Sequence, residues 1–501
     1  MSRAGEPLLL GIDVGTASSK GVLATVSGEV VAVSERPHLV SRPRPGWFEH
    51  DAEEVWWADV VALTRELAAR AGRALRGVCV SGIGPCVVPC DGALRPLRPA
   101  ILYGVDTRAE AEVAELTERF GDEAILARCG SQLSSQALGP KLLWLARNER
   151  RLWDETRGWY MASSFAVARL TGEYVLDHHS ASQCDPLYDL TTGDWAYDWA
   201  PEICPGVELP RLVWPGEQVG TVTAAAAART GLPEGLPVAA GTIDAWAEAF
   251  SVGVRRPGDL MLMYGSTMFF VQVAAASPRA AGLWSTAGVE PGAPTLAAGM
   301  STSGSLTDWL RSLSGTPFAA LAREASEVPA GARGLLVLPY FAGERSPLFD
   351  PHARGVVAGL TLDHGRAELA RAIYEAIGYG VRHNLEAFAA AGAPGRRVVA
   401  VGGGTKNGLW TQVVSSIAGV AQEVPRVTTG AAYGDALLAG IAAGLVAPES
   451  DWTVADATVE PAPADAAVYE RLYADYLELY PATAGIVHRL AALQEQPQPQ
   501  S

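Results

Sequence analysis

Cysteine is scarce in this sequence, with six residues among 501. No two of them form a Cys-x-x-Cys pair and no histidine stands at ligand spacing from them, so a zinc-binding framework is not indicated. We expect six reduced thiols in the core. No apolar run reaches the roughly 18 residues that a membrane-spanning helix needs, and residues 1–6 are too short and polar for a signal peptide. These absences predict a cytoplasmic protein that does not enter a membrane.

Positive charge is also in deficit. The formal net charge is -16 at pH 7, because 39 Lys and Arg stand against 55 Asp and Glu. A field of this sign repels polyanions, so we expect no nucleic-acid partner, although a local basic pocket is still allowed. Hydrophobic residues make up 49% of the chain and charged residues 19%. This composition predicts a folded protein with sizeable cores.

The length is greater than one hydrophobic core usually fills. Short strands joined by glycine turns are predicted at 8–14, 21–26 and 30–34, and a strand–turn–strand pattern at 260–271 repeats this opening. The repetition suggests an internal duplication. The predicted units are an N-terminal domain at 1–254, a C-terminal domain at 255–490 and a disordered Gln/Pro-rich tail at 491–501.

Strands and helices alternate in the second half of the chain, which indicates an α/β protein. Near the N-terminus, Asp51 precedes a predicted helix that runs to about Ala71 and has Asp-to-Glu capping-box spacing. The segment 171–215 is rich in Tyr, Trp, Asp and turn residues without periodicity, and we expect irregular structure there. The predicted buried face of the first helix consists of Trp56, Val60, Leu63 and Leu67.

Asp244 follows the apolar run 236–240 and the glycine at position 241. An aspartate at the end of a buried strand, after a residue that permits close approach, is a carboxylate held at a fixed point. Such a group can accept a proton. The alternative is that Asp244 only caps a helix starting at Ala245, which is a common role for aspartate.

The first hairpin carries polar groups suited to an anion. Gly15 permits a tight turn whose backbone N–H groups can face a phosphate, Thr16 and Ser18 add hydroxyls, and Lys20 adds a positive charge. Asp13, at the strand end, could hold Mg²⁺ directly or through water. The turn is not a Walker A loop, because no glycine precedes Lys20 and no Ser or Thr follows it. An ordinary Gly-Thr hairpin turn remains the alternative.

Two further glycine loops lie in the second half. Gly265, Ser266 and Thr267 could cradle a second phosphate, and the run 402–404 follows a strand and precedes a helix. A dinucleotide site is the rival for this run, but its spacing fails at Asn407. Phosphoryl transfer needs phosphate donors, a divalent cation and a proton acceptor, and the sequence offers all three.

The segments 355–360 and 368–375, read as Gly-Val-Val-Ala-Gly-Leu and Glu-Leu-Ala-Arg-Ala-Ile-Tyr-Glu, resemble a signature of the FGGY carbohydrate kinase family, in its xylulokinase-like branch. Supporting similarity lies at 141–145 and 339–347. The resemblance extends from Gly11 to about Gly444.

This resemblance implies two actin-like (ribonuclease H-like) domains with a deep cleft between them, with ATP held mainly by the second domain and the sugar by the first. It implies ATP and Mg²⁺ as cofactors, transfer of the γ-phosphoryl group to a small sugar such as the ketopentose xylulose, and a homodimer as a family-level guess. Other ketoses, polyols, or a silent sugar sensor of the same fold remain alternatives. Asp244 matches the family's catalytic aspartate and Asp13 its metal-associated aspartate. The residues expected at ATP are Thr16, Ser18, Lys20, Gly265, Ser266, Thr267, Gly403, Gly404 and Asn407.

Three departures from the family pattern affect the sugar side. The usual Gln-Met-His-Gly is replaced by Ile-Gly-Pro-Cys at 83–86, the Asn or Gln after the catalytic aspartate is Ala245, and the usual tryptophan is Tyr103. Such changes alter which hydroxyl pattern a site accepts. Asp106 could contact the sugar or instead form a surface salt bridge with Arg108. The residues expected at the sugar are Gly84, Tyr103, Asp106 and Asp244.

Overall fold

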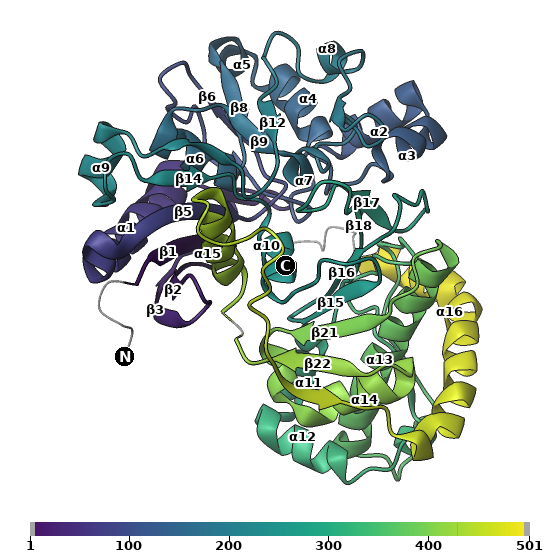
Figure 1. The fold of residues 1–501 in the computed structure, drawn as a ribbon. Coiled ribbons are helices and arrows are strands. Elements are labelled where there is room, and N and C mark those ends of the chain that lie inside the picture. Colours follow the sequence, from purple (N-terminus) through teal and green to yellow (C-terminus); the bar gives the residue numbers. More distant parts are fainter. Residues whose placement is uncertain (1–5, 428, 495–501) are drawn as a thin grey trace.

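The chain folds into two α/β halves, each built on a mixed sheet (Figure 1). The computed structural model describes residues 6–427 and 429–494. The first sheet has the strand order β13 (Gln218–Thr221), β14 (Pro237–Ala239), β5 (Leu75–Gly82), β1 (Leu8–Val14), β2 (Ser18–Thr25), β3 (Val30–Pro37). The second has the order β17 (Trp284–Thr286), β18 (Thr295–Met300), β16 (Met268–Val273), β15 (Asp259–Tyr264), β21 (Arg397–Val401), β22 (Gln422–Pro425), β23 (Ala455–Val459).

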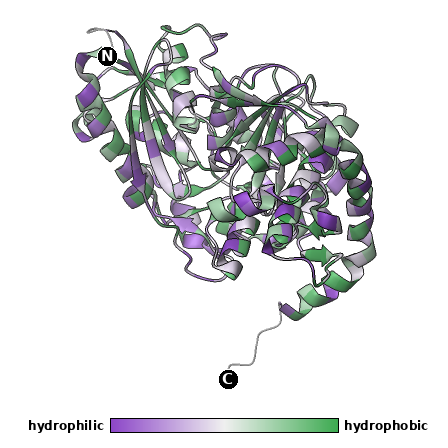
Figure 2. Ribbon diagram, turned by 90° about the horizontal axis from the view of Figure 1, so that it is seen from below, coloured by the Kyte–Doolittle hydropathy of each residue, from purple (hydrophilic) through white to green (hydrophobic). Residues whose placement is uncertain are grey.

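Both sheets repeat one pairing scheme. In the first, β1, β2 and β3 are antiparallel neighbours, while β5 and β14 continue from β1 in parallel. In the second, β15, β16 and β18 are antiparallel, while β21 and β22 continue from β15 in parallel. The central strands are buried on both faces, which explains their almost unbroken apolar sequences, and both sheets are largely green in Figure 2. The expected duplication of an α/β unit is therefore present in the topology.

Two helices fill the space between the sheets, α10 (Asp244–Ser251) and α15 (Ala431–Ala442). Although α15 belongs to the second half of the chain, it packs on β1 and β5 of the first sheet (Figure 1). Glycines permit this: a Cβ on Gly11 would lie 2.0 Å from the Ala432 carbonyl oxygen, and one on Gly434 would lie 2.1 Å from that of Ala247. The predicted unit 255–490 thus places one of its helices on the first sheet.

The first predicted helix is present as a π-helical turn, Ala52–Trp57, followed by α1 (Ala58–Ala71). The Asp51 side chain accepts hydrogen bonds from the backbone N–H groups of residues 53 and 54, as an N-cap does. All four residues of its predicted inner face are fully buried. The remaining long helices are α2 (Glu110–Phe120), α3 (Asp122–Cys129), α4 (Gly139–Asn148), α6 (Ala162–Thr171), α11 (Gly304–Ser314), α12 (Phe318–Ser326), α13 (Arg366–Ala390), α14 (Gly408–Ala418) and α16 (Ala466–Gln494).

The segment 171–215 is more ordered than predicted. It contains the parallel pair β9 (Val175–Asp177) and β12 (Arg211–Val213). Its remaining elements are too short to carry a periodic pattern, which is why the sequence did not reveal them. They are α7 (His178–Ala181), β10 (Tyr188–Asp189), β11 (Asp194–Trp195) and α8 (Ala200–Ile203).

Short elements complete the two halves. They are β4 (Glu49–His50), β6 (Val88–Cys90), β7 (Ala100–Ile101), α5 (Arg150–Glu155), β8 (Gly158–Tyr160), α9 (Ala224–Thr230), β19 (Leu336–Leu338), β20 (Val356–Ala358) and the 3₁₀ turns Gly72–Ala74, Ala332–Gly334, Gly403–Lys406 and Pro463–Asp465.

The C-terminal prediction needs a correction. Helix α16 continues to Gln494, so residues 491–494 are helical, and Ala491 is fully buried. The Gln- and Pro-rich composition of the last residues led to the prediction of disorder, although Ala491 packs its side chain into the core at the helix end. The rest of the predicted tail, 495–501, lies outside the described residues. Within those described, no helix is long and apolar enough to cross a membrane.

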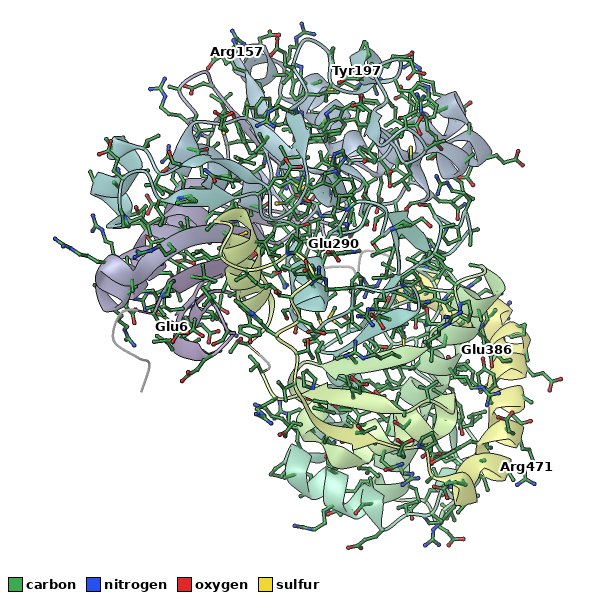
Figure 3. The ribbon with its side chains drawn as sticks, viewed as in Figure 1. Glu6, Arg157, Tyr197, Glu290, Glu386 and Arg471 are labelled. Carbon is green, nitrogen blue, oxygen red and sulfur yellow. The ribbon has the colours of Figure 1, made fainter. Side chains whose placement is uncertain are left out.

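The link between the two halves is held by Arg255. Its Nε donates to Glu290 Oε2 at 2.9 Å, and its Nη1 donates to the Ser450 carbonyl at 2.7 Å. Glu290 lies near the middle of the molecule in Figure 3, close to where the halves meet. All six cysteines are buried and free, as expected for core thiols.

Candidate active site

A cavity of about 720 Å³ lies between the two halves and is lined by both. Its size is typical of a small-ligand site. The walls come from the β1–β2 turn, the end of β5, the start of α10, the β15–β16 turn and the loop after β21. The expected interdomain cleft is therefore present. The predicted site residues that line it are Asp13, Thr16, Lys20, Gly84, Tyr103, Asp244, Thr267 and Gly403.

Asp244 is the first residue of α10 and lines the cavity. The N-cap is Ile243, so the capping alternative does not hold as stated, although Asp244 Oδ1 accepts a hydrogen bond from the Ala245 N–H at 2.7 Å. The preceding backbone is pinned beside β5: a Cβ on Gly241 would lie 1.8 Å from the Val80 carbonyl oxygen. The Thr242 hydroxyl donates to Oδ1 of the buried Asp177 at 2.8 Å. This packing holds the Asp244 carboxylate at the cavity wall.

Three carboxylates lie together at this wall, Asp13, Asp244 and Glu248. Burial raises the pKa of Asp244 to about 6. Burial and the charge of Asp244 raise the pKa of Glu248 to about 7. The pKa of Asp13 is raised well above its ordinary value by burial and then by Asp244, while Lys20 acts in the opposite direction. Burial and mutual repulsion therefore oppose full ionisation of the three carboxylates, and Lys20 offsets only part of this effect.

Asp13 fits a role at Mg²⁺. Its Oδ1 is buried and has no hydrogen-bond partner within the described chain. Mg²⁺ prefers oxygen ligands and is usually held by one or two carboxylates together with substrate phosphates. No group of three or more His, Cys, Asp or Glu side chains in the described part forms a metal cage. The residues therefore suit a metal that arrives with a phosphate-bearing ligand.

The first hairpin contributes fewer phosphate donors than expected. Gly15 donates its N–H to the Ser18 carbonyl at 3.1 Å, and the Ser18 hydroxyl donates to Glu35 at 2.7 Å. Ser18 does not line the cavity, and its hydroxyl is bonded to Glu35 on the neighbouring strand β3. Thr16 does, and its hydroxyl lies 3.2 Å from the Tyr103 hydroxyl.

In the two glycine loops of the second half, some predicted residues line the cavity and others do not. Thr267 and Gly403 line the cavity, and a Cβ on Gly403 would meet no atom within 4 Å. Ser266 uses its carbonyl to hold the start of α11, accepting at 3.0 Å from the Ser305 N–H.

The other predicted residues of these loops, Gly265, Gly404 and Asn407, stand outside the lining. Gly304 donates its N–H to the Gly265 carbonyl at 3.0 Å, and a Cβ on Gly404 would lie 2.6 Å from Trp410. Asn407 caps α14. These residues support the loops instead of facing the cleft.

The sugar-side prediction needs one correction, at Asp106. This residue is 1% exposed, accepts hydrogen bonds from the Phe48 N–H (2.7 Å) and from Arg108 (2.7 Å), and does not line the cavity. The alternative, a salt bridge with Arg108, is confirmed as a pair, but it is not at the surface, because both side chains are fully buried. Gly84 does face the cavity, and a Cβ there would lie 2.6 Å from Ile243.

Several lining residues were missed. Glu248 could have been found, because it lies four residues after Asp244 on one helix face. The others carry no local signal of a ligand role, even where they lie in the recognised segments 260–271 and 339–347, and only folding brings them to the cleft. They are Gln136, Gln183, Trp246, Phe269, Trp284 and Arg345.

Two mixed-sheet halves with carboxylates in the cleft between them are an arrangement suited to phosphoryl transfer. Family comparison agrees: residues 8–251 match the N-terminal domain of the FGGY family of carbohydrate kinases, and residues 260–443 match its C-terminal domain. The chain belongs to this family of ATP-using enzymes, which phosphorylate an alcohol group, as the resemblance predicted.

Relatives with two different substrates stand at similar distance. A xylulose kinase of Escherichia coli is 31% identical over 444 residues, covering 87% of this chain and 90% of its own. A glycerol kinase of Nocardia farcinica is 30% identical over 489 residues, covering 91% and 94%. The crystal structure of a xylulose kinase from Rhodospirillum rubrum superposes with a TM-score of 0.89 at 33% identity, covering 96% of this chain and 100% of that one. Family membership therefore leaves the acceptor open.

Proposed function

We propose that the protein binds ATP with Mg²⁺ in the interdomain cleft and transfers the γ-phosphoryl group to a hydroxyl of a small sugar. A ketopentose such as xylulose is the first candidate, because xylulose kinases stand among its relatives. Another ketose or a polyol is the alternative, since a glycerol kinase is similarly close. The observation that carries the proposal is the Asp244 carboxylate, fixed at the cleft wall beside Asp13 and Glu248.

Asp244 acts as general base in this mechanism. The acceptor hydroxyl lies against Gly84 and Tyr103, and Asp244 takes its proton as the oxygen attacks the γ-phosphorus atom. A pKa near 6 leaves Asp244 ionised at neutral pH yet basic enough to share a proton. Thr16, Lys20, Thr267 and Gly403 face the phosphate chain.

Asp13 would hold Mg²⁺, either directly or through water, with the ATP phosphates as its other ligands. When bound, the ion would neutralise charge on the phosphate oxygens. Lys20 offsets part of the negative charge of the cluster before ATP arrives. Closure of the two halves would exclude water, which otherwise competes with the sugar as acceptor.

A silent sugar sensor of the same fold is the second candidate. The presence of Asp13, Asp244 and lining positions from three glycine loops favours an active kinase. The homodimer stays a prediction, which light scattering of the purified protein tests.

The test is ADP release with a panel of ketopentoses, ketohexoses, tetruloses, polyols and glycerol. The proposal expects turnover with at least one sugar, lowered far more than ATP affinity in Asp244→Asn. No turnover on any acceptor, together with sugar binding by calorimetry, would favour the sensor.

A further inference from the structure

One end of the cleft, beside Tyr103, is lined by side chains that the mechanism above does not use. Gln136, Gln183 and Trp284 also line a small adjoining pocket, so the three lie together. The positive charge of Arg345 lies close enough to the Tyr103 hydroxyl to act on its pKa. The unused polar residues of this end are Gln136, Gln183, Trp284 and Arg345.

A hydrogen-bonded chain fixes how the two amides point. The His179 Nδ1 lies 2.7 Å from the Ala287 carbonyl, which can only accept, and burial lowers the pKa of His179 to about 3. The ring is therefore neutral, and its Nε2 accepts from Gln183 Nε2 at 3.1 Å. At the other end the Gly104 N–H, which can only donate, bonds Gln136 Oε1 at 3.1 Å. The bonds at both ends of this hydrogen-bonded series therefore require the same orientation of the two amide groups.

The chain leaves N–H groups over. Gln136 Nε2 donates to Gln183 Oε1 at 3.5 Å, so one N–H of each amide is used within the chain and one is left. Both amides line the cavity, so a ligand bound there can accept hydrogen bonds from these N–H groups. A Cβ on Gly104 would lie 2.3 Å from Gln136 Oε1, so the loop that carries Tyr103 is shaped to receive the amide.

Arg345 adds a cation to the same end. It packs against the backbone of Gly299 and donates to the Met300 carbonyl at 3.0 Å. No carboxylate of residues 6–427 or 429–494 forms an ion pair with it. The neighbouring Glu344 offsets part of its charge without a direct ion pair, so the half-buried guanidinium keeps N–H donors that an acceptor on a ligand can satisfy. The Trp284 Nε1 is also buried without an acceptor in the described chain.

We propose that Gln136, Gln183 and Arg345 form the specificity subsite for the non-reacting end of the acceptor, and that this end carries a carbonyl or carboxylate oxygen. The inference rests on the proposed kinase function. Donated N–H groups suit an oxygen that only accepts, whereas an alcohol brings an O–H that also needs an acceptor. The subsite therefore favours ketoses or sugar acids over polyols and glycerol.

Three acceptors with the same five carbons test this: xylulose, xylonate and xylitol. kcat/KM for xylulose or xylonate should exceed that for xylitol by roughly 10- to 100-fold, because a buried unpaired polar group discriminates strongly. A preference for xylulose identifies a ketone and one for xylonate a carboxylate, and either supports the inference. Equal or faster turnover of xylitol overturns the inference but leaves the kinase proposal intact. No turnover on any sugar of the wider panel would instead refute the kinase proposal.

Arg345→Met and Gln183→Leu separate a specificity role from a structural one. Each should reduce the preference over xylitol by about tenfold, with the KM for ATP unchanged. Gln412→Leu is the matched control, since Gln412 bonds Ser416 and the Glu460 carbonyl outside the cavity. An equal loss on all three acceptors, in variants that melt at the wild-type temperature, would contradict the assignment.

Discussion

The proposed base makes a prediction about pH. Asp244 must be ionised to accept a proton, and burial raises its pKa to about 6. The fraction of enzyme with an ionised base is then about nine tenths at pH 7, one tenth at pH 5 and one hundredth at pH 4. kcat/KM for the sugar at saturating ATP and Mg²⁺ should therefore fall about tenfold per pH unit below 6.

Asp244→Asn tests the same group at fixed pH. Asparagine keeps the size of the side chain and its acceptor for the Ala245 N–H, so the fold should survive. Removing the base should lower kcat by roughly 10²- to 10⁴-fold. ATP affinity should be the same or higher, because one negative charge near Asp13 is lost. Coupled measurement of ADP release from pH 4 to 8, with calorimetry for ATP, checks both effects. A native rate in the variant, or a flat wild-type profile over this range, would refute the assignment.

Three further changes can be measured. Asp13→Asn should raise the Mg²⁺ concentration that gives half-maximal rate by tenfold or more, since it removes the negative charge of a carboxylate whose Oδ1 has no partner in the described chain; an unchanged Mg²⁺ titration would argue against that role. Asp435→Asn should flatten the fall of stability between pH 4 and 8. Burial raises the Asp435 pKa from 3.8 to about 8, so the folded state binds a proton that the unfolded state releases in this window, and stability drops as pH rises. If the melting temperature of the variant fell with pH as steeply as that of the wild type, this prediction would be contradicted. Gly434→Val should destabilise by about 1–3 kcal/mol or more, because its Cβ would lie 2.1 Å from the Ala247 carbonyl. Gly408→Ala, with nothing within 4 Å, is the control for the thermal melts, and equal melting of both variants would be the opposing result.

Local patterns carried much of the fold. The run Leu8–Val14 was predicted at its observed bounds, and the helix predicted to run to about Ala71 ends at that residue as α1. These elements have long apolar patterns with clear turns at their ends. The segment 171–215 failed because elements of two to four residues leave no periodicity to read.

The site was predicted unevenly, for a physical reason. Asp13 stands at the end of β1 and Asp244 at the start of the helix that follows β14, positions where sequence order alone indicates the ligand side of a sheet. Asp106 and Ser18 have equally suitable chemistry. However, Asp106 is hydrogen-bonded to the buried Arg108, and Ser18 to Glu35 on the neighbouring strand. Whether a polar side chain is free or already bonded depends on partners distant in sequence.

By itself the sequence determined the α/β class, the duplicated hairpins, the family and the two central aspartates, because each depends on local periodicity or on short motifs. Only the tertiary structure decided that α15 returns to the first sheet and which polar groups face the cleft. It also brought Gln136, Gln183 and Arg345 to one end of that cleft. Their association depends on contacts between segments up to about 200 residues apart in the chain, and no local pattern encodes such a contact.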